Sequence, residues 1–357
     1  MGDTTMTTHE RFSRMFGHME ADRVAMWDFP WPGALRRWQA EGMPAGAGYD
    51  DYFGVDKVGR IKVDNSPQYP EKVVEETDRF ITVTTQWGAV VRNFKEQDST
   101  PDFLDFTITS PAKWEEAKRR IAATPDRVPW DYLKENYPLW KKEGRWILGD
   151  TFFTYENMHS SVGGTELMLM ALADDPEWIV EMCGHFLDVN LALLDMAWDA
   201  GYTFDMLNVL DDMGYKYTTF FSPKAYRDYL KPIHEKAVRW AHNKGIKVRL
   251  HSCGYIATLL PDIAGAGFDA LHPMEVKAGM DPADVKRKYG KDLVLHGGIN
   301  AMLWNDLGAV KAEMERLVPV LKEGGGYIFA ADHSIPNDVS FENIKEIIRY
   351  AKELGKY

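Results

Sequence analysis

Hydrophobic and polar positions alternate regularly through the second half of the chain. Four segments that fit buried strands lie at 247–251, 269–273, 293–297 and 327–331. The segments between them place apolar side chains every three to four residues, as Val310, Met314 and Leu317 do, and this is the period of an amphipathic helix. Strands that alternate with helices predict a parallel sheet covered by helices.

The first half shows the same alternation with longer connections. Strand-like segments lie at 24–27, 146–149 and 204–210, and a proline follows a capping residue at two expected helix starts, Asp175–Pro176 and Ser222–Pro223. Residues 73–94 differ, because β-prone residues such as those at 80–85 predict an inserted antiparallel β ribbon.

The expected fold is therefore α/β, a (β/α)8 TIM barrel with an N-terminal extension and the inserted ribbon. We expect a single domain over residues 1–357, with an elaborated N-terminal half over about 1–145 and regular βα units over 146–357. An open doubly wound sheet is the alternative. It lacks its usual ligand signal, since the sequence has no G-x-G-x-x-G after a strand and no G-x-x-x-x-G-K-[ST].

The charge balance narrows the range of partners. The 357 residues carry 42 Lys and Arg against 54 Asp and Glu, a formal net charge of −12, which disfavours nucleic acid and anionic membranes as partners. No apolar run reaches the ~18 residues of a membrane-spanning helix. The start, Met1–Thr5, has no basic segment followed by an apolar one, and only two cysteines occur. We expect a cytoplasmic protein.

Polar side chains follow the predicted strands at their carboxyl ends, where parallel α/β proteins carry their functional residues. They are Asp150, Asp211, Asp212, His251, Cys253, Glu275, Asn300, Asp332 and His333. For Asp150 and Asn300 a helix N-cap is an equally good explanation. The whole set is harder to explain as caps, because His, Cys and Glu are not preferred there.

His251 and Cys253 stand two residues apart at one strand end, so an imidazole and a thiolate can turn toward one point. Zn²⁺ accepts nitrogen and sulfur ligands, and a catalytic zinc keeps one open position. His333 supplies a third donor and Glu275 a fourth, exchangeable one. The alternative for Cys253 is a small buried hydrophobe, the role expected of Cys183 within its helix.

Two further groups of residues predict a substrate site above the strands. The predicted catalytic side chains are Glu156, His159, Asp211 and Asp212. For Glu156 and His159 a solvated loop is an equally good explanation. The predicted wall of an aromatic pocket consists of Trp27, Phe29, Trp31, Phe153 and Tyr155. The alternative for the aromatic segment near residue 30 is packing over the barrel end, with prolines blocking regular structure. His272 and His296 lie within strands and are interpreted as core residues or as supports behind a site.

Two motifs, 251–254 (His-Ser-Cys-Gly) and 332–336 (Asp-His-Ser-Ile-Pro), resemble the uroporphyrinogen decarboxylase superfamily. Supporting stretches lie at 222–223, 226–227, 230–232, 280–281 and 296–299. The resemblance covers most of the chain from about Ile147 onward. It implies a (β/α)8 barrel, in agreement with the fold expected from the hydrophobic pattern.

The resemblance separates two branches. The decarboxylases carry an Arg-rich N-terminal motif for the carboxylates of a tetrapyrrole, which residues 26–33 lack and for which Arg36 and Arg37 are a poor substitute. The cobamide-dependent methyltransferases hold zinc with a His-x-Cys motif and a later Cys. His251 and Cys253 match that motif, His333 stands at the position of the later Cys, and Glu275 stands where that branch can place a carboxylate ligand.

The resemblance therefore implies a zinc-dependent methyltransferase. It would move a methyl group from a methoxylated, most simply aromatic, small molecule to the Co(I) corrinoid (cobalamin) of a corrinoid-binding partner protein. Three alternatives stay open: methyl transfer from methylcob(III)alamin to a thiol, a metal-free decarboxylase, and a noncatalytic barrel that binds a ligand. The oligomeric state is also open, a homodimer being one option.

Overall fold

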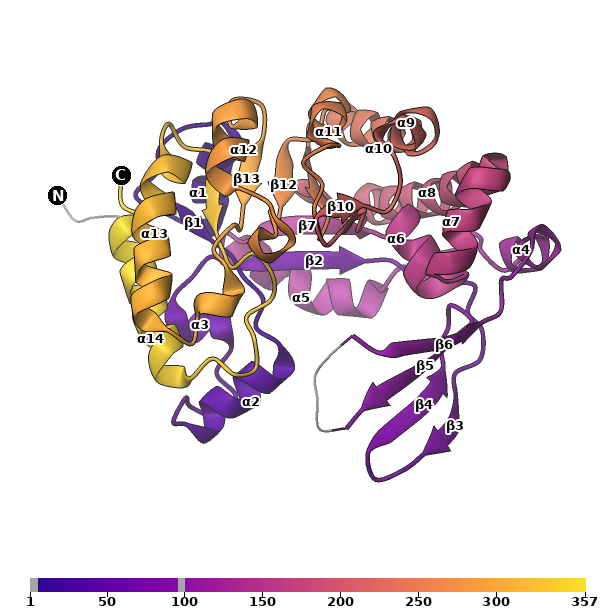
Figure 1. Ribbon diagram of the computed structural model, residues 1–357, viewed down its shortest axis with the longest axis horizontal. Coiled ribbons are helices and arrows are strands. Elements are labelled where there is room, and N and C mark those ends of the chain that lie inside the picture. Colours follow the sequence, from indigo (N-terminus) through magenta and orange to yellow (C-terminus); the bar gives the residue numbers. More distant parts are fainter. Residues whose placement is uncertain (1–5, 96–99) are drawn as a thin grey trace.

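The computed structural model describes residues 6–95 and 100–357. Residues 1–5, which entered the expectation of a cytoplasmic protein, lie outside the described residues. Eight parallel strands form one sheet in the order β1-β14-β13-β12-β11-β8-β7-β2 (Figure 1). Their bounds are β1 Ala25–Met26, β2 Val58–Lys62, β7 Trp146–Thr151, β8 Met206–Leu210, β11 Lys247–His251, β12 Ala270–His272, β13 Val294–His296 and β14 Tyr327–Phe329.

The strand order follows the chain around the sheet without reversing, which confirms the predicted (β/α)8 barrel and excludes a doubly wound sheet. The larger helices lie outside the sheet (Figure 1). The helices are α1 Thr8–Phe16, α2 Pro32–Ala40, α3 Tyr49–Phe53, α4 Pro111–Lys118, α5 Trp130–Lys142, α6 Tyr155–Asn157, α7 Thr165–Asp174, α8 Pro176–Asp199, α9 Pro223–Ala225, α10 Lys231–Asn243, α11 Leu260–Gly265, α12 Pro282–Tyr289, α13 Leu307–Lys322 and α14 Phe341–Leu354. Whether residues 1–357 form a single domain stays a prediction.

The predicted β ribbon is confirmed, and it extends by one strand beyond the predicted range of residues 73–94. It is an antiparallel sheet with the strand order β3-β4-β5-β6, set apart from the barrel (Figure 1). Its strands are β3 Lys72–Glu76, β4 Phe80–Thr84, β5 Ala89–Phe94 and β6 Asp102–Phe106. The fourth strand lies beyond the predicted range because its sequence, Asp-Phe-Leu-Asp-Phe, mixes acidic residues into the β-prone pattern.

The N-terminal extension closes the barrel at the amino ends of its strands and at the seam between β1 and β2. Helix α1 places Phe12, Met15 and Phe16 against Trp146 and other inward-facing apolar residues. At the seam, the Asp56 N–H donates to the Met26 carbonyl (2.9 Å), and the Asp56 carboxylate accepts the Met26 N–H (2.8 Å). The buried Arg11 of α1 pairs with the same carboxylate.

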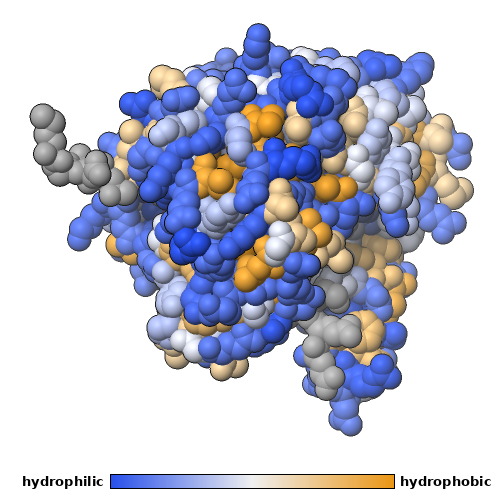
Figure 2. Space-filling model, turned by 60° about the vertical axis from the view of Figure 1, so that its left-hand side comes forward, coloured by the Kyte–Doolittle hydropathy of each residue, from blue (hydrophilic) through white to orange (hydrophobic). Residues whose placement is uncertain are grey.

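The surface agrees with an acidic chain. On the face drawn in Figure 2, hydrophilic residues predominate and the hydrophobic ones form patches separated by them. Within 6–95 and 100–357, no helix combines the length and the apolar character needed to cross a bilayer.

Candidate functional site

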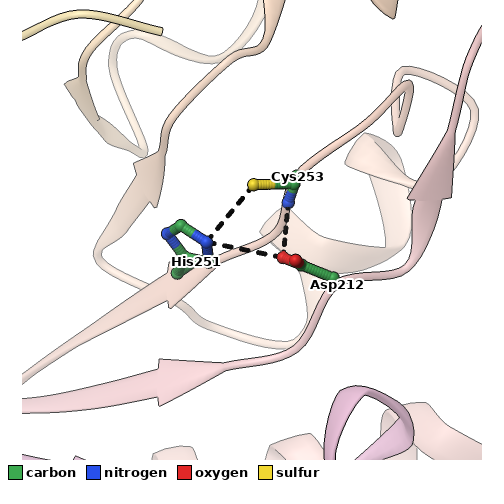
Figure 3. Close-up of side chains that lie close together, drawn as sticks. All are labelled: Asp212, His251 and Cys253. Carbon is green, nitrogen blue, oxygen red and sulfur yellow. Dashed lines mark hydrogen bonds and ion pairs between the residues drawn. The ribbon is translucent and has the colours of Figure 1, made fainter. Parts of the chain in front are cut away.

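Three polar side chains meet at the carboxyl ends of β8 and β11. His251 ends β11, Cys253 follows it by two residues, and Asp212 follows β8 (Figure 3). His251 Nε2 lies 3.4 Å from Cys253 Sγ and 3.4 Å from Asp212 Oδ1. In the described part of the chain this is the one group of three or more His, Cys, Asp or Glu side chains whose ligand atoms lie within 4.8 Å of one another.

A close contact between two glycines brings the loops together. A Cβ on Gly254 would lie 2.2 Å from the carbonyl carbon of Gly214, and a Cβ on Gly214 would lie 2.5 Å from the Cys253 oxygen. Only glycine fits at such a distance, and Gly254 also has a φ of +80°. Beside this contact, the Cys253 N–H donates to Asp212 Oδ1 (2.7 Å). The backbone therefore holds Cys253 and Asp212 next to each other.

The loop after Cys253 also explains a difference from the predicted structure. The whole segment between the strands at 247–251 and 269–273 was expected to be helical, but α11 covers only Leu260–Gly265. Tyr255 instead forms a β-bridge with Tyr215, its N–H donating to the Tyr215 carbonyl at 2.9 Å. The residues that fix the position of Cys253 are thus taken from the start of the expected helix.

His251 presents a neutral imidazole to the group. Burial, followed by the charge of Arg249, lowers the pKa of His251 to about 3. Its Nδ1 lies 2.6 Å from His272 Nδ1. When His251 donates in this bond, its Nε2 lone pair is free and points toward Cys253 and Asp212, the arrangement found in metal-bound histidines. His272 thus lies directly behind His251, and its role as a support stays a prediction.

Cys253 and Asp212 both hold their protons more tightly than usual. Burial, then the negative charge of Asp212, raises the pKa of the Cys253 thiol well above its ordinary value. Burial, then the charge of Glu156, raises the pKa of Asp212 to about 7. A cation would reverse both effects, because it stabilises the thiolate and the carboxylate together.

The donor set fits a divalent metal ion. A neutral nitrogen, a sulfur and a carboxylate oxygen are all accepted zinc ligands, and two ligands on one tetrahedral zinc lie about 3.5 Å apart. The 3.4 Å separations from His251 Nε2 agree with that spacing. The three side chains could hold a metal ion, and Asp212, predicted as a catalytic residue, joins His251 and Cys253 in this group.

The other two predicted ligands lie nearby but outside the group. Glu275 Oε2 accepts the Gly254 N–H (2.6 Å), and Glu275 Oε1 lies 3.2 Å from Lys277 Nζ. His333 lines the same cavity as His251 and stacks on Trp31 at 6.4 Å between ring centroids. Their role as ligands stays a prediction.

The remaining predicted catalytic residues form a second cluster beside Asp212. Glu156 Oε2 lies 2.7 Å from His159 Nε2. Asp211 is fully buried, where its Oδ1 accepts the Glu156 N–H (2.8 Å) and its Oδ2 lies 3.1 Å from His234 Nε2. Asp211 therefore fixes the position of Glu156 from behind.

The predicted aromatic wall is divided between the cavity and the core. Phe29 lines the cavity. Trp27, Phe153 and Tyr155 are at most 1% exposed, and Tyr155 stacks on His159 at 4.9 Å. Trp31 is partly exposed beside His333. Their role in substrate binding stays a prediction.

The cavity of about 170 Å³ at the barrel mouth contains residues that the sequence analysis missed. Besides His251, His272 and His333, it is lined by Arg60, Asn208 and Arg249. The missed signal was a charge pattern of period two within a buried strand: Lys247, Arg249 and His251 alternate with Val248 and Leu250. Such alternation means that one face of the strand is polar.

Fold and site together define a parallel α/β barrel with an ionisable cavity at the carboxyl ends of its strands. The uroporphyrinogen decarboxylase (URO-D) family model matches residues 153–354, more than half of the chain. The chain belongs to this family, which confirms the resemblance found in its motifs.

Individual relatives are more distant. Uroporphyrinogen decarboxylases from Shewanella amazonensis and Aeromonas salmonicida are 28% and 27% identical to the chain over 140 and 139 residues. The matched region spans 38% of the chain and 38% of each of these relatives. A solved structure described as a methyltransferase from Methanosarcina mazei aligns over 98% of this chain and 99% of that one, with a TM-score of 0.66 and 15% identity. At that identity the match shows a shared fold.

Proposed function

We propose that the chain is a zinc-dependent methyltransferase that moves a methyl group from a methoxylated small molecule to the Co(I) corrinoid of a partner protein. The observation that carries this proposal is the convergence of Asp212, His251 and Cys253 on one point at the barrel mouth. The full-length structural match to a protein described as a methyltransferase supports it. Asp212, His251 and Cys253 would hold the zinc, with Glu275 and His333 as the further predicted ligands.

Breaking an ether C–O bond leaves an electron pair on oxygen, so the site must stabilise an anion and align the methyl carbon with its acceptor. A zinc ion held by the site would act as a Lewis acid toward that oxygen. His272 keeps the His251 ring oriented through the 2.6 Å contact between their Nδ1 atoms. The bond from the Cys253 N–H fixes Asp212 beside it.

The product oxygen also needs a proton. Glu156 and His159, 2.7 Å apart, form a proton-carrying pair next to Asp212. Asp211 accepts the Glu156 N–H and is itself held beside His234, and these two contacts keep the pair in place. We assign His159 as the proton donor and Glu156 as the group that orients it.

A metal-free decarboxylase is the second candidate, favoured by the names of the curated relatives. One observation argues against a tetrapyrrole substrate. Arg37 does not line the cavity beside His251, because its side chain pairs with Glu41 and donates to the Asp338 carbonyl.

The test combines metal analysis with a methyl-transfer assay. Protein purified without added metal is expected to contain about one zinc per chain, and to form methylcobalamin from methoxyarenes and free cob(I)alamin. Cys253→Ala should abolish both. Cys183→Ala is the matched control, since Cys183 is the other cysteine and lies buried in α8. Zinc-free protein that releases CO₂ from carboxylated substrates would favour the decarboxylase instead.

A further inference from the structure

Arg249 is a buried cation without a counter-ion. Its side chain lies inside the barrel and is 2% exposed. Nε and Nη2 donate to Asn208 Oδ1 at 3.0 and 2.8 Å, and Nη1 lies 2.7 Å from His296 Nδ1. The guanidinium also stacks on the Trp27 ring at 4.2 Å. All these partners are neutral, and Arg249 forms no ion pair with any residue in 6–95 or 100–357.

The bond between His296 and the backbone shows that Arg249 is the donor toward His296. His296 Nε2 lies 2.7 Å from the Trp27 carbonyl, which can only accept, so Nε2 carries the ring proton and Nδ1 accepts from Arg249. A guanidinium has five N–H groups. Three are used here, which leaves one N–H on each terminal nitrogen. Two such N–H donors can serve the two oxygens of one carboxylate.

The acidic residues in the cavity wall and beside it already have hydrogen-bond partners. Asp150 accepts from Arg60 with both oxygens (2.8 and 3.1 Å) and from Asn208 Nδ2 (2.8 Å). Asp28 uses its two oxygens for the N–H groups of Phe29 and Ala331. Arg60 thus forms a direct ion pair with Asp150, whereas Arg249 feels the charge of Asp150 only from beyond ion-pair distance.

A buried charge is costly unless an opposite charge accompanies it. An arginine side chain stays protonated inside proteins, so Arg249 is a cation at neutral pH. Arg249 lines the cavity, and so does His251, two residues further along the same face of β11. Residues two apart on a strand are separated by about 6.6 Å. A small molecule can therefore span from Arg249 to the metal-binding group.

We propose that Arg249 binds the carboxylate of the substrate, so that the substrate is a small methoxylated organic acid. Its carboxylate takes the two free N–H groups of Arg249, and its methoxy group lies at Asp212, His251 and Cys253. The assignment of the methoxy end rests on the proposed function, whereas the carboxylate end rests on Arg249 alone.

Matched acids and amides test the carboxylate end. Methoxyacetate and the methoxybenzoates are compared by calorimetry at pH 7 with methoxyacetamide and the methoxybenzamides, which keep size and shape and lose the charge. At least one acid should bind tenfold or more tightly than its amide, with or without zinc. Equal affinities within each pair, or no binding of any probe, would overturn the proposal. This comparison needs no variant.

Variants locate the site. Arg249→Met should weaken binding of the preferred acid at least tenfold, to the level of its amide, and change the amide less than threefold. Arg316→Met, which removes an exposed arginine from α13, is the matched control and should change neither. Circular dichroism confirms that each variant is folded. Acid binding that survives Arg249→Met would contradict the proposal.

The same materials separate this inference from the proposed function. If neutral methoxyarenes lose their methyl group as fast as the acids do, the carboxylate assignment fails and the methyltransferase proposal stands. If acids bind through Arg249 but no methyl group reaches cob(I)alamin, the methyltransferase proposal fails and the anion site stands.

Discussion

The two ends of the barrel interior differ in chemistry although the same strands build both. At the amino ends of the strands, here called the lower layer, the inward-facing side chains are apolar and pack against α1. The carboxyl ends form the upper layer. Two residues further along four strands, the inward-facing side chain becomes polar: Leu148 is followed by Asp150, Met206 by Asn208, Ala270 by His272 and Val294 by His296.

This change divides the barrel into an apolar part, which stabilises the fold, and a polar part, which carries the candidate site. The lower layer contributes the free energy of burying apolar surface. The upper layer carries groups such as Arg249, His251 and Cys253, whose pKa values burial shifts away from their ordinary range. Such shifts are tolerated where a ligand or metal ion compensates for them. Substitutions in the lower layer should therefore lower the free energy of unfolding and spare zinc affinity, and substitutions in the upper layer should do the opposite.

The largest effect is expected from removing an apolar side chain of the lower layer. Phe12 is fully buried and packs on Trp27 and Trp146 at 6.2 and 5.6 Å between ring centroids. Phe12→Ala should lower the free energy of unfolding by about 3–5 kcal/mol and leave zinc content per folded molecule unchanged. Denaturant titration measures the first. Phe103→Ala, which truncates an exposed side chain of β6, should lower the free energy of unfolding far less. A loss of zinc without destabilisation would contradict the division.

The next effect separates the two cysteines. Cys253→Ala should reduce zinc affinity by at least about 100-fold, because a directly bound ligand matters more than the outer-shell groups worth 10–100-fold. Its melting temperature without metal should barely change. Cys183→Ala should do the reverse, because Cys183 is fully buried in the core. Chelator competition and thermal melts measure both. Equal zinc affinity in the two variants would refute the metal assignment.

Sequence patterns predicted the fold because burial has a period. Strands buried on both faces, such as β12 and β13, are short apolar runs, and α13 and α14 carry apolar stripes. Strand β2 was missed because Gly59, Arg60 and Lys62 break that pattern. Arg60 faces the cavity, and a Cβ at Gly59 would lie 2.5 Å from the Trp140 ring. Both exceptions reflect contacts that only the folded chain makes.

The site was predictable as a set of strand ends but not as a geometry. Strand order explains why His251 and Asp212 are neighbours, since β8 and β11 pair directly. It does not reveal that Asp212 turns toward the group while Asp211, one residue earlier, turns into the core beside His234. The polar alternation at 247–251 places Arg249 on one face of its strand, but its neutral partners, Asn208 and His296, come from other strands and could not be foreseen.

A smaller effect is expected from the support behind the metal-binding group. His272→Ala removes the partner of His251 Nδ1 and should lower zinc affinity about 10–100-fold. His242→Ala is a matched control, because His242 is an exposed histidine on α10, with its Nε2 2.8 Å from Asp269. Titration with a competing chelator gives both affinities. An affinity within twofold of the unmodified protein would show that His272 does not orient His251.

The smallest effect is a change of slope with pH. Metal binding requires deprotonated ligands, so each proton displaced lowers the affinity tenfold per unit fall in pH. The pKa of His251, about 3, means that it loses no proton near neutrality. The Cys253 thiol, whose pKa burial raises, loses one throughout. Asp212, with a pKa of about 7, loses a second only below that value.

Logarithmic zinc affinity should therefore rise with a slope of about one between pH 7.5 and 8.5, and approach two between pH 5.5 and 6.5. In Asp212→Asn the slope should stay near one over both ranges, because the second titrating ligand is gone. Chelator competition at stepped pH measures these slopes. A steeper dependence that persists in Asp212→Asn would mean that a histidine, not Asp212, takes up the second proton. In that case His251 would take up a proton near neutral pH despite its burial and the nearby charge of Arg249.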